Sequence, residues 1–138
     1  MENIKIVIWG FGAMGKGMAD MLLTKKGVEI TGVCDLHKDL VGNSIFNVLE
    51  QKQNNHKEVI VSNDIDSLLN KENCDLVLLC TDSYTKKAFP KMKRILEKGI
   101  NVISTAEEMA YPQAQEPELA KELNFIAKDN NVTVLGTG

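Results

Sequence analysis

The stretch IKIVIWGFGAMG, residues 4–15, constrains the fold of this chain more than any other feature. Residues 4–9 are mostly apolar and β-branched, which is typical of a strand buried on both faces of a parallel sheet. Three glycines follow in the spacing G-x-G-x-x-G, at Gly10, Gly12 and Gly15. Because a parallel strand needs a crossover to reach its neighbour, a helix is expected after this turn. The stretch therefore predicts a strand, a tight turn and a helix.

Similar strand-like stretches recur along the chain and alternate with stretches of helical periodicity. We expect strands at 4–9, 28–35, 58–64, 74–81, 100–105 and 132–138. We expect helices at 13–24, 66–73, 84–98 and 117–131, with a further short helix and an exposed loop within 36–57. This alternation predicts an α/β fold, a Rossmann-type, doubly wound, mostly parallel six-stranded sheet with strand order 3-2-1-4-5-6.

The first expected helix, 13–24, carries an apolar stripe. Met14, Met18, Met21 and Leu22 recur at the spacing of one helical face. We therefore expect these methionines to lie against the sheet.

Length, charge and cysteine usage exclude several classes of protein. A chain of 138 residues is long enough for one domain and too short for two ordinary ones. The formal net charge of −3 disfavours a nucleic-acid partner, and the basic run 86–98 is expected to be a solvated helix face. No apolar run approaches the roughly 20 residues that a bilayer span needs, so we expect no membrane partner and a cytoplasmic location.

The cysteines and histidines do not predict a metal site. Cys34, Cys74 and Cys80 form no C-x-x-C pair and lie in or beside apolar stretches, so we expect small buried side chains rather than a disulfide. His37 and His56 have no second histidine or cysteine at zinc-ligand spacing. We expect no metal.

The glycine turn lies in the context of a dinucleotide-binding motif. Gly10 permits the tight turn, Gly12 lets the backbone approach a pyrophosphate, and Gly15 allows the helix to pack on the strand. The free N–H groups at the start of the helix favour phosphate. Asp35 stands 20 residues after Gly15, at the end of the second expected strand, where its carboxylate can bind the ribose hydroxyls. We interpret residues 1–138 as a dinucleotide-binding domain.

Asp35 favours NAD, because a carboxylate repels the 2′-phosphate of NADP. His37 and Lys38 are close enough in sequence to bind that phosphate if Asp35 turns aside, so NADP stays open. In such sheets the ligand lies beyond the carboxyl ends of the strands, which adds residues after the fourth and fifth strands. The candidate cofactor-binding residues are Gly10, Phe11, Gly12, Ala13, Met14, Gly15, Asp35, Leu36, His37, Thr81, Asp82, Ser83 and Thr105.

Glu107 and Glu108 are candidates for a position near the substrate, where a carboxylate favours an ammonium group. The alternative is that the two glutamates complement the dipole at the start of a helix.

Several stretches also resemble one family. IVIWGFGAMGKGMA, VCDLHKDLVG and LLCTDSY, and above all GINVISTAEEMAYP at 99–112 and the closing LGTG, resemble the amino-terminal NAD(P)-binding domain of the 2,4-diaminopentanoate dehydrogenases of ornithine degradation. The dihydrodipicolinate reductases are more distant relatives of this family. The resemblance extends over the whole chain.

The resemblance implies an oxidative deamination of the diamino acid 2,4-diaminopentanoate to 2-amino-4-oxopentanoate. A hydride passes from the amine-bearing carbon to C4 of the nicotinamide of NAD or NADP, and water then hydrolyses the imine and releases ammonia. Members of the family are longer, with a second α/β domain that forms most of the substrate site, and the whole enzyme is expected to be a homo-oligomer. The resemblance thus implies that residues 1–138 bind cofactor without turning over substrate alone, and it assigns no catalytic acid or base.

Two other classes of protein share the glycine turn. A nucleotide-sensing Rossmann regulatory domain binds NAD without catalysis, and it has no need for the paired glutamates and the aromatic residue in segment 105–112. A methyltransferase that uses S-adenosylmethionine usually has the spacing G-x-G-x-G, whereas Met14 stands here at the third glycine position of that pattern. The dehydrogenase interpretation is favoured over both.

Overall fold

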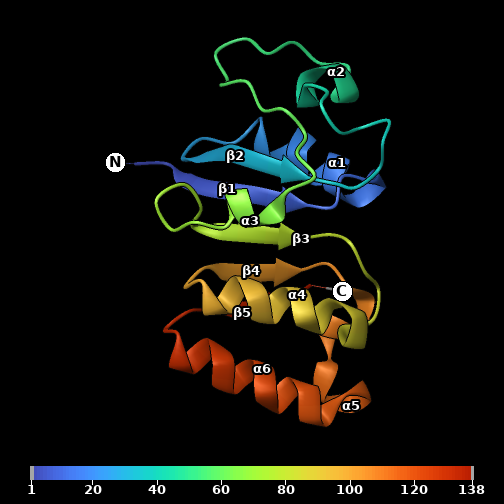
Figure 1. Ribbon diagram of the computed structural model, residues 1–138, viewed down its shortest axis with the longest axis vertical. Helices are drawn as coiled ribbons and strands as arrows, with labels where there is room; N and C mark the ends of the chain where they lie inside the picture. The colour runs from blue at the N-terminus through green and yellow to red at the C-terminus, as the bar shows by residue number, and fades with distance from the viewer. Residues whose placement is uncertain (1, 138) are drawn as a thin grey trace.

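The computed structural model describes residues 2–137, which form one parallel sheet with helices on both faces (Figure 1). The strands lie in the order β2-β1-β3-β4-β5. This arrangement confirms the predicted α/β Rossmann-type fold. The elements are β1 (Ile4–Trp9), α1 (Ala13–Leu22), β2 (Val28–Cys34), α2 (Ile45–Leu49), α3 (Ile65–Leu68), β3 (Leu76–Leu79), α4 (Thr85–Glu97), β4 (Asn101–Ser104), the 3-10 helix η1 (Glu107–Ala110), α5 (Pro112–Gln115), α6 (Pro117–Asp129) and β5 (Val134–Gly136).

The stretch 58–64, predicted as a strand beside β2, is not a strand. Its backbone hydrogen bonds are divided between two neighbours. The N–H of Ser62 donates to the Val33 carbonyl in β2, whereas the N–H of Val61 donates to the Asn43 carbonyl in a loop. The stretch therefore makes only isolated bridges, and the described sheet has five strands rather than six.

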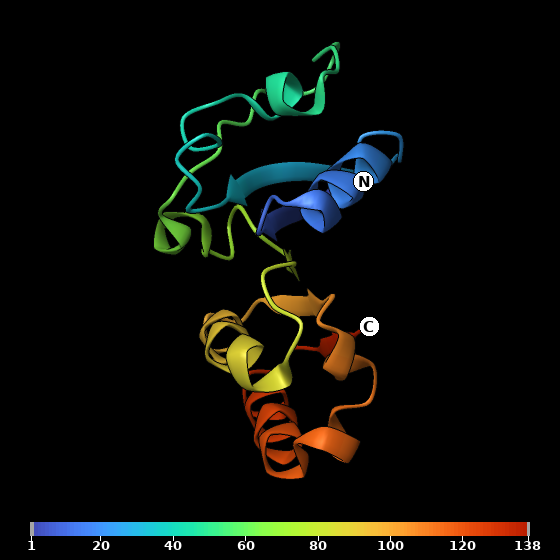
Figure 2. The ribbon, with the colours of Figure 1, turned by 90° about the vertical axis from the view of Figure 1, so that its right-hand side faces the viewer.

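The sheet separates two hydrophobic cores. Because successive side chains of a strand point to opposite faces, Val7 and Trp9 of β1 pack under α3, α4 and α6. Figure 2 shows α1 on one side of the sheet and α3 and α4 on the other. The core on the α1 side consists of Ile6, Ile8, Phe11, Ala19, Leu22, Ile30, Val33, Ile45, Phe46, Val59, Val61 and Leu78.

Helix α1 packs on the sheet through Gly15, Ala19 and Leu22. The prediction that the methionine stripe lies against the sheet is wrong for two residues, since Met14 and Met21 are 51% and 43% exposed. The helix approaches β1 so closely that small side chains fit beneath it and the longer ones lie at its margins.

The three cysteines are free thiols, Cys34 and Cys74 buried and Cys80 half-buried, as expected for small apolar side chains. Burial is the main cause that raises the pKa of Cys34 and of Cys74 to about 11. Both thiols therefore remain protonated at neutral pH.

Two properties of residues 2–137 bear on the kind of site to expect. No helix in this range combines the length and the apolar character that a membrane crossing needs. The same residues contain no group of three or more His, Cys, Asp or Glu side chains arranged to hold a metal ion.

Candidate functional site

The carboxyl ends of four strands meet at one edge of the sheet, and the predicted site residues gather there. β1 leads into Gly10, β2 into Asp35, β3 into the loop with Thr81, and β4 into Thr105. From β1 the chain first builds β2 on one side and then returns to place β3 on the other. The strand order thus reverses between β1 and β3, which is where open α/β sheets bind their ligands.

Two glycines of the turn are required by the packing of the chain itself. Gly10 has φ +101°, and a Cβ there would lie 2.8 Å from the carbonyl oxygen of Cys80. A Cβ on Gly15 would lie 1.9 Å from the carbonyl oxygen of Gly10, far inside van der Waals contact. Both positions therefore exclude any larger residue.

Gly12 differs from the other two. Its backbone is extended, with φ −79° and ψ −158°, and a Cβ there would meet no atom within 4 Å. Nothing within the described chain requires a glycine at this position, and the space in front of it is open.

Gly12 is also the N-cap of α1, and within residues 2–137 no side chain accepts a hydrogen bond from the first N–H groups of the helix. These groups include those of Ala13 and Met14, both exposed. Free N–H groups and the positive end of the helix dipole together make a binding site for an anion such as a phosphate.

Asp35 is fixed beside this turn by two backbone donors. The N–H of Phe11 donates to its Oδ2 at 2.6 Å, and the N–H of His37 donates to its Oδ1 at 2.8 Å. The carboxylate thus does not turn aside in this structure, and each oxygen keeps a second lone pair for a ligand hydroxyl. Phe11 takes part through its backbone alone, because its side chain is fully buried.

Asp35 borders a first hollow of about 660 Å³, within the usual range of cofactor sites. It lies beyond the ends of β1, β2 and β3 and extends between α3 and α4. Its lining residues are Trp9, Gly10, Gly12, Cys34, Asp35, Leu36, Asn63, Asp64, Ile65, Asp66, Cys80, Thr81, Lys91 and Arg94.

A second hollow of about 220 Å³ adjoins the first, and the two share Cys80 and Thr81. It is lined by Met14, Cys80, Thr81, Asp82, Ser83, Thr105 and Glu107. Two adjoining hollows, with the N-terminus of α1 beside both, suit a ligand of two halves joined by phosphates.

Lys91 of α4 braces the loop after β3. Its ammonium donates to Thr81 Oγ1 at 2.8 Å and to Asp82 Oδ2 at 2.9 Å, and it lies 5.6 Å from the centroid of a Trp9 ring. Partial burial raises the pKa of Asp82, but hydrogen bonds from Thr81 and Lys91 and the charges of Lys91 and Lys87 outweigh it. The pKa of this carboxyl is therefore below its usual value.

The lowered pKa gives an expected pH dependence. Because the folded-state pKa of Asp82 lies below the unfolded value of about 3.9, its stabilising contribution is present above that value and is lost as pH falls through the folded pKa. The difference in free energy of unfolding between the parent chain and Asp82→Asn is expected to be about 1 kcal/mol at neutral pH and smaller near about pH 3. Urea denaturation at the two pH values measures it. An equal difference at both values would contradict this origin.

Glu107 and Glu108, which are adjacent in sequence, have different surroundings in the structure. Glu107 lines the second hollow. Glu108 Oε1 instead accepts the N–H of Thr85 at 2.9 Å, at the start of α4, and the Glu108 N–H donates to the Ser83 carbonyl at 3.2 Å. Its carboxylate therefore caps α4, which is a helix other than its own.

Of the remaining predicted residues, Leu36 lines a hollow and His37 does not. Leu36 lines the first hollow with 81% of its surface exposed. His37 lines neither hollow, and its Nδ1 accepts the N–H of Asp39 at 3.1 Å. Lys91 and Arg94, which line the first hollow, were assigned from the sequence to a solvated face. Their spacing of three residues on α4 is the signal that they share one side of the helix.

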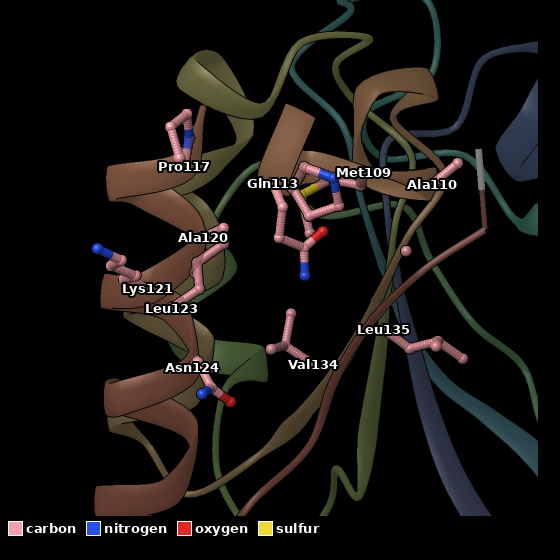
Figure 3. Close-up of a pocket in the computed structure, with 12 residues that line it drawn as sticks. Met109, Ala110, Gln113, Pro117, Ala120, Lys121, Leu123, Asn124, Val134 and Leu135 are labelled. Carbon is pink, nitrogen blue, oxygen red and sulfur yellow. The ribbon is translucent and has the colours of Figure 1, made fainter. Parts of the chain in front are cut away.

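A third hollow, of about 580 Å³, lies along β5 between η1, α5 and α6 (Figure 3). Gln113 and Val134 extend into it, and Lys121 is the charged residue among those that line it. Among the described residues that line it there is no glycine turn and no carboxylate side chain. The candidate site is therefore the pair of hollows at the carboxyl ends of the strands.

The chain also resembles known proteins in sequence and in fold. The chain matches the model of the oxidoreductase family with an NAD-binding Rossmann fold over residues 4–137. It is 55% identical over 138 residues to 2,4-diaminopentanoate dehydrogenase of Acetoanaerobium sticklandii. This match covers 100% of the present chain and 38% of the dehydrogenase. NAD is therefore the cofactor of this domain.

Two solved structures have the same architecture. An amine dehydrogenase from Mycobacterium smegmatis superposes with a TM-score of 0.88 and 34% identity, over 99% of this chain and 40% of that one. GenD2 from gentamicin A biosynthesis, solved in complex with NAD, gives a TM-score of 0.72 over 99% of this chain and 34% of that one, and at 18% identity it is a match of fold. The chain thus spans less than half the length of these relatives.

Proposed function

The chain belongs to the oxidoreductase family with an NAD-binding Rossmann fold, and we propose that it is the cofactor-binding part of a dehydrogenase that deaminates 2,4-diaminopentanoate. The diamine is inferred from the dehydrogenase of Acetoanaerobium sticklandii, and an amine as the reacting group also from the amine dehydrogenase structure. Because the chain spans less than half of either protein, the reaction is proposed for the whole enzyme.

The open space in front of Gly12 is the observation that carries the proposal. A Cβ at Gly12 would meet nothing in the chain, whereas Gly10 and Gly15 are required by internal contacts. A bound pyrophosphate accounts for the glycine at position 12, because it would approach the backbone there and accept hydrogen bonds from the start of α1. The ribose hydroxyls of the adenosine would then donate to the oxygens of Asp35.

The two hollows suit the two halves of the cofactor. The first hollow, which borders Asp35, would hold the adenosine, and the second would hold the nicotinamide, which accepts a hydride when the cofactor is bound. Thr81, Asp82 and Ser83 would position the middle of the cofactor, and Thr105 its nicotinamide end. Glu107 would lie on the side where a substrate ammonium approaches, and its charge would favour that group.

The exchange Asp35→Ala tests the cofactor site. We expect the variant to bind NADH at least about tenfold more weakly, because charge-assisted hydrogen bonds to the ribose are lost. Quenching of the single tryptophan, Trp9, which lines the first hollow, measures the affinity, and calorimetry checks it.

Asp39→Ala is the matched control. Asp39 lies in the same loop, and its side chain is 78% exposed and lines neither hollow. Its loss should leave the NADH affinity unchanged. Equal affinities of the parent chain and Asp35→Ala would overturn this role of Asp35.

The substrate is tested with the whole enzyme. Incubation with 2,4-diaminopentanoate and NAD should release ammonia and form NADH in equal amounts. Formation of NADH with other amines but not with this diamine would refute the proposed substrate while leaving the cofactor site intact.

A further inference from the structure

The first hollow carries two cations from one side of α4, Lys91 and Arg94, which the cofactor contacts proposed above do not use. Their partners differ. Lys91 is held by Thr81 and Asp82 and lies over Trp9, so three groups fix its ammonium. Arg94 pairs with Asp66 alone among the described ion pairs.

The pair of Arg94 and Asp66 is open to solvent. The side chains are 44% and 59% exposed, and ion pairs of this exposure contribute little to stability. The guanidinium can therefore exchange one anionic partner for another at small cost. A phosphate is the better partner, because it carries more charge than a carboxylate and has three acceptor oxygens rather than two.

Arg94 lines the same hollow as Asp35 and as Cys34, the last residue of β2. Burial, the largest cause, and the charges of Asp35 and Asp64 raise the pKa of the Cys34 thiol, the charges of Arg94 and Lys91 lower it, and the net result is a pKa of about 11. Asp35, Asp64, Lys91 and Arg94 all line the first hollow. A phosphate on the 2′ oxygen of the adenosine ribose would lie in this group of charges.

The carboxylate cannot leave room for such a phosphate by turning away, since two backbone N–H groups hold it. A neighbouring cation is then required to offset its repulsion. The residues that the sequence suggested for this role, His37 and Lys38, do not line the hollow. Arg94 does.

We propose that Arg94 binds the 2′-phosphate when the site holds NADP, exchanging Asp66 for the phosphate. The proposal rests on the dinucleotide site described under the proposed function. It makes Arg94 a determinant of nucleotide choice and Asp66 an internal competitor of the phosphate.

The test is a titration of the parent chain and of single variants with NADPH and, separately, with NADH, followed by Trp9 fluorescence and calorimetry. Arg94→Gln should weaken NADPH binding by about tenfold or more and change NADH binding by less than about twofold. Asp66→Asn should tighten NADPH binding severalfold, because Arg94 is then free. Lys98→Gln, which removes an exposed cation at the end of the same helix, should change neither affinity.

Several results would overturn the role of Arg94 and leave the proposed cofactor site intact. These are NADH binding without detectable NADPH binding by the parent chain, an equal loss of both nucleotides in Arg94→Gln, no loss in that variant, or a selective loss of NADPH in Lys38→Gln instead. Failure of the folded parent chain to bind either nucleotide would overturn the proposed cofactor site as well.

Discussion

The exchange Gly12→Val is expected to abolish NADH binding while the chain remains folded. Its side chain would enter the space in front of α1, where the pyrophosphate is proposed to lie, so we expect a loss of at least about a hundredfold, or about 2.7 kcal/mol. Because nothing in the chain lies within 4 Å of a Cβ at this position, the stability cost should stay below about 1 kcal/mol, the value of a poorer N-cap. Trp9 fluorescence titration and urea denaturation measure the two effects.

Gly17→Ala is the control for this exchange. Gly17 lies in the same helix, and a Cβ there would also meet nothing within 4 Å. It should leave the NADH affinity unchanged and raise the free energy of unfolding by about 0.5–1 kcal/mol, because alanine favours the helix. Parent-like NADH binding by Gly12→Val would show that no ligand occupies the space.

The exchange Gly15→Ala is expected to give the opposite pattern, with a large loss of stability. Its Cβ would lie 1.9 Å from the carbonyl oxygen of Gly10, which is backbone and cannot rotate away. Helix α1 would have to move off β1, so we expect a loss of about 3 kcal/mol or more in the free energy of unfolding, and weaker NADH binding with it. Chemical denaturation measures the loss. A parent-like midpoint would mean that α1 lies farther from the strand in solution.

Local patterns predict most of this fold. Residues 4–9 form β1 because a nearly continuous apolar, β-branched run is typical of a strand covered on both faces, and the β-branched residues of 28–34 form β2 beside it. The stretch 58–64 shows where this reasoning fails. It has the composition of a strand, yet its backbone bonds are shared between β2 and the loop at Asn43, and a sequence pattern does not say which partner a backbone group will find.

Some residues of the candidate site could be predicted from the sequence and others could not. The glycine turn could be found because its spacing is local, and Asp35 because it directly follows β2, the strand next to β1. Arg94 could not be found from the sequence, since its position at the hollow depends on how α4 packs against the sheet. Glu108 was ambiguous for a similar reason, because the helix that it caps is α4 rather than its own.

The two cores on opposite faces of the sheet differ in when their residues become available during synthesis. Apart from Leu78, the core on the α1 side comes entirely from residues 6–61, whereas the opposite core extends from Val7 to Ala127. Because residues are synthesised in order from the N-terminus, all of the first core except Leu78 exists before α4 is made, so one face of β1 can be covered while the other still awaits α4. The nascent chain would then hold Asp35 and the glycine turn early, and would first be able to bind nucleotide only when the loop after β3 and α4 have been made.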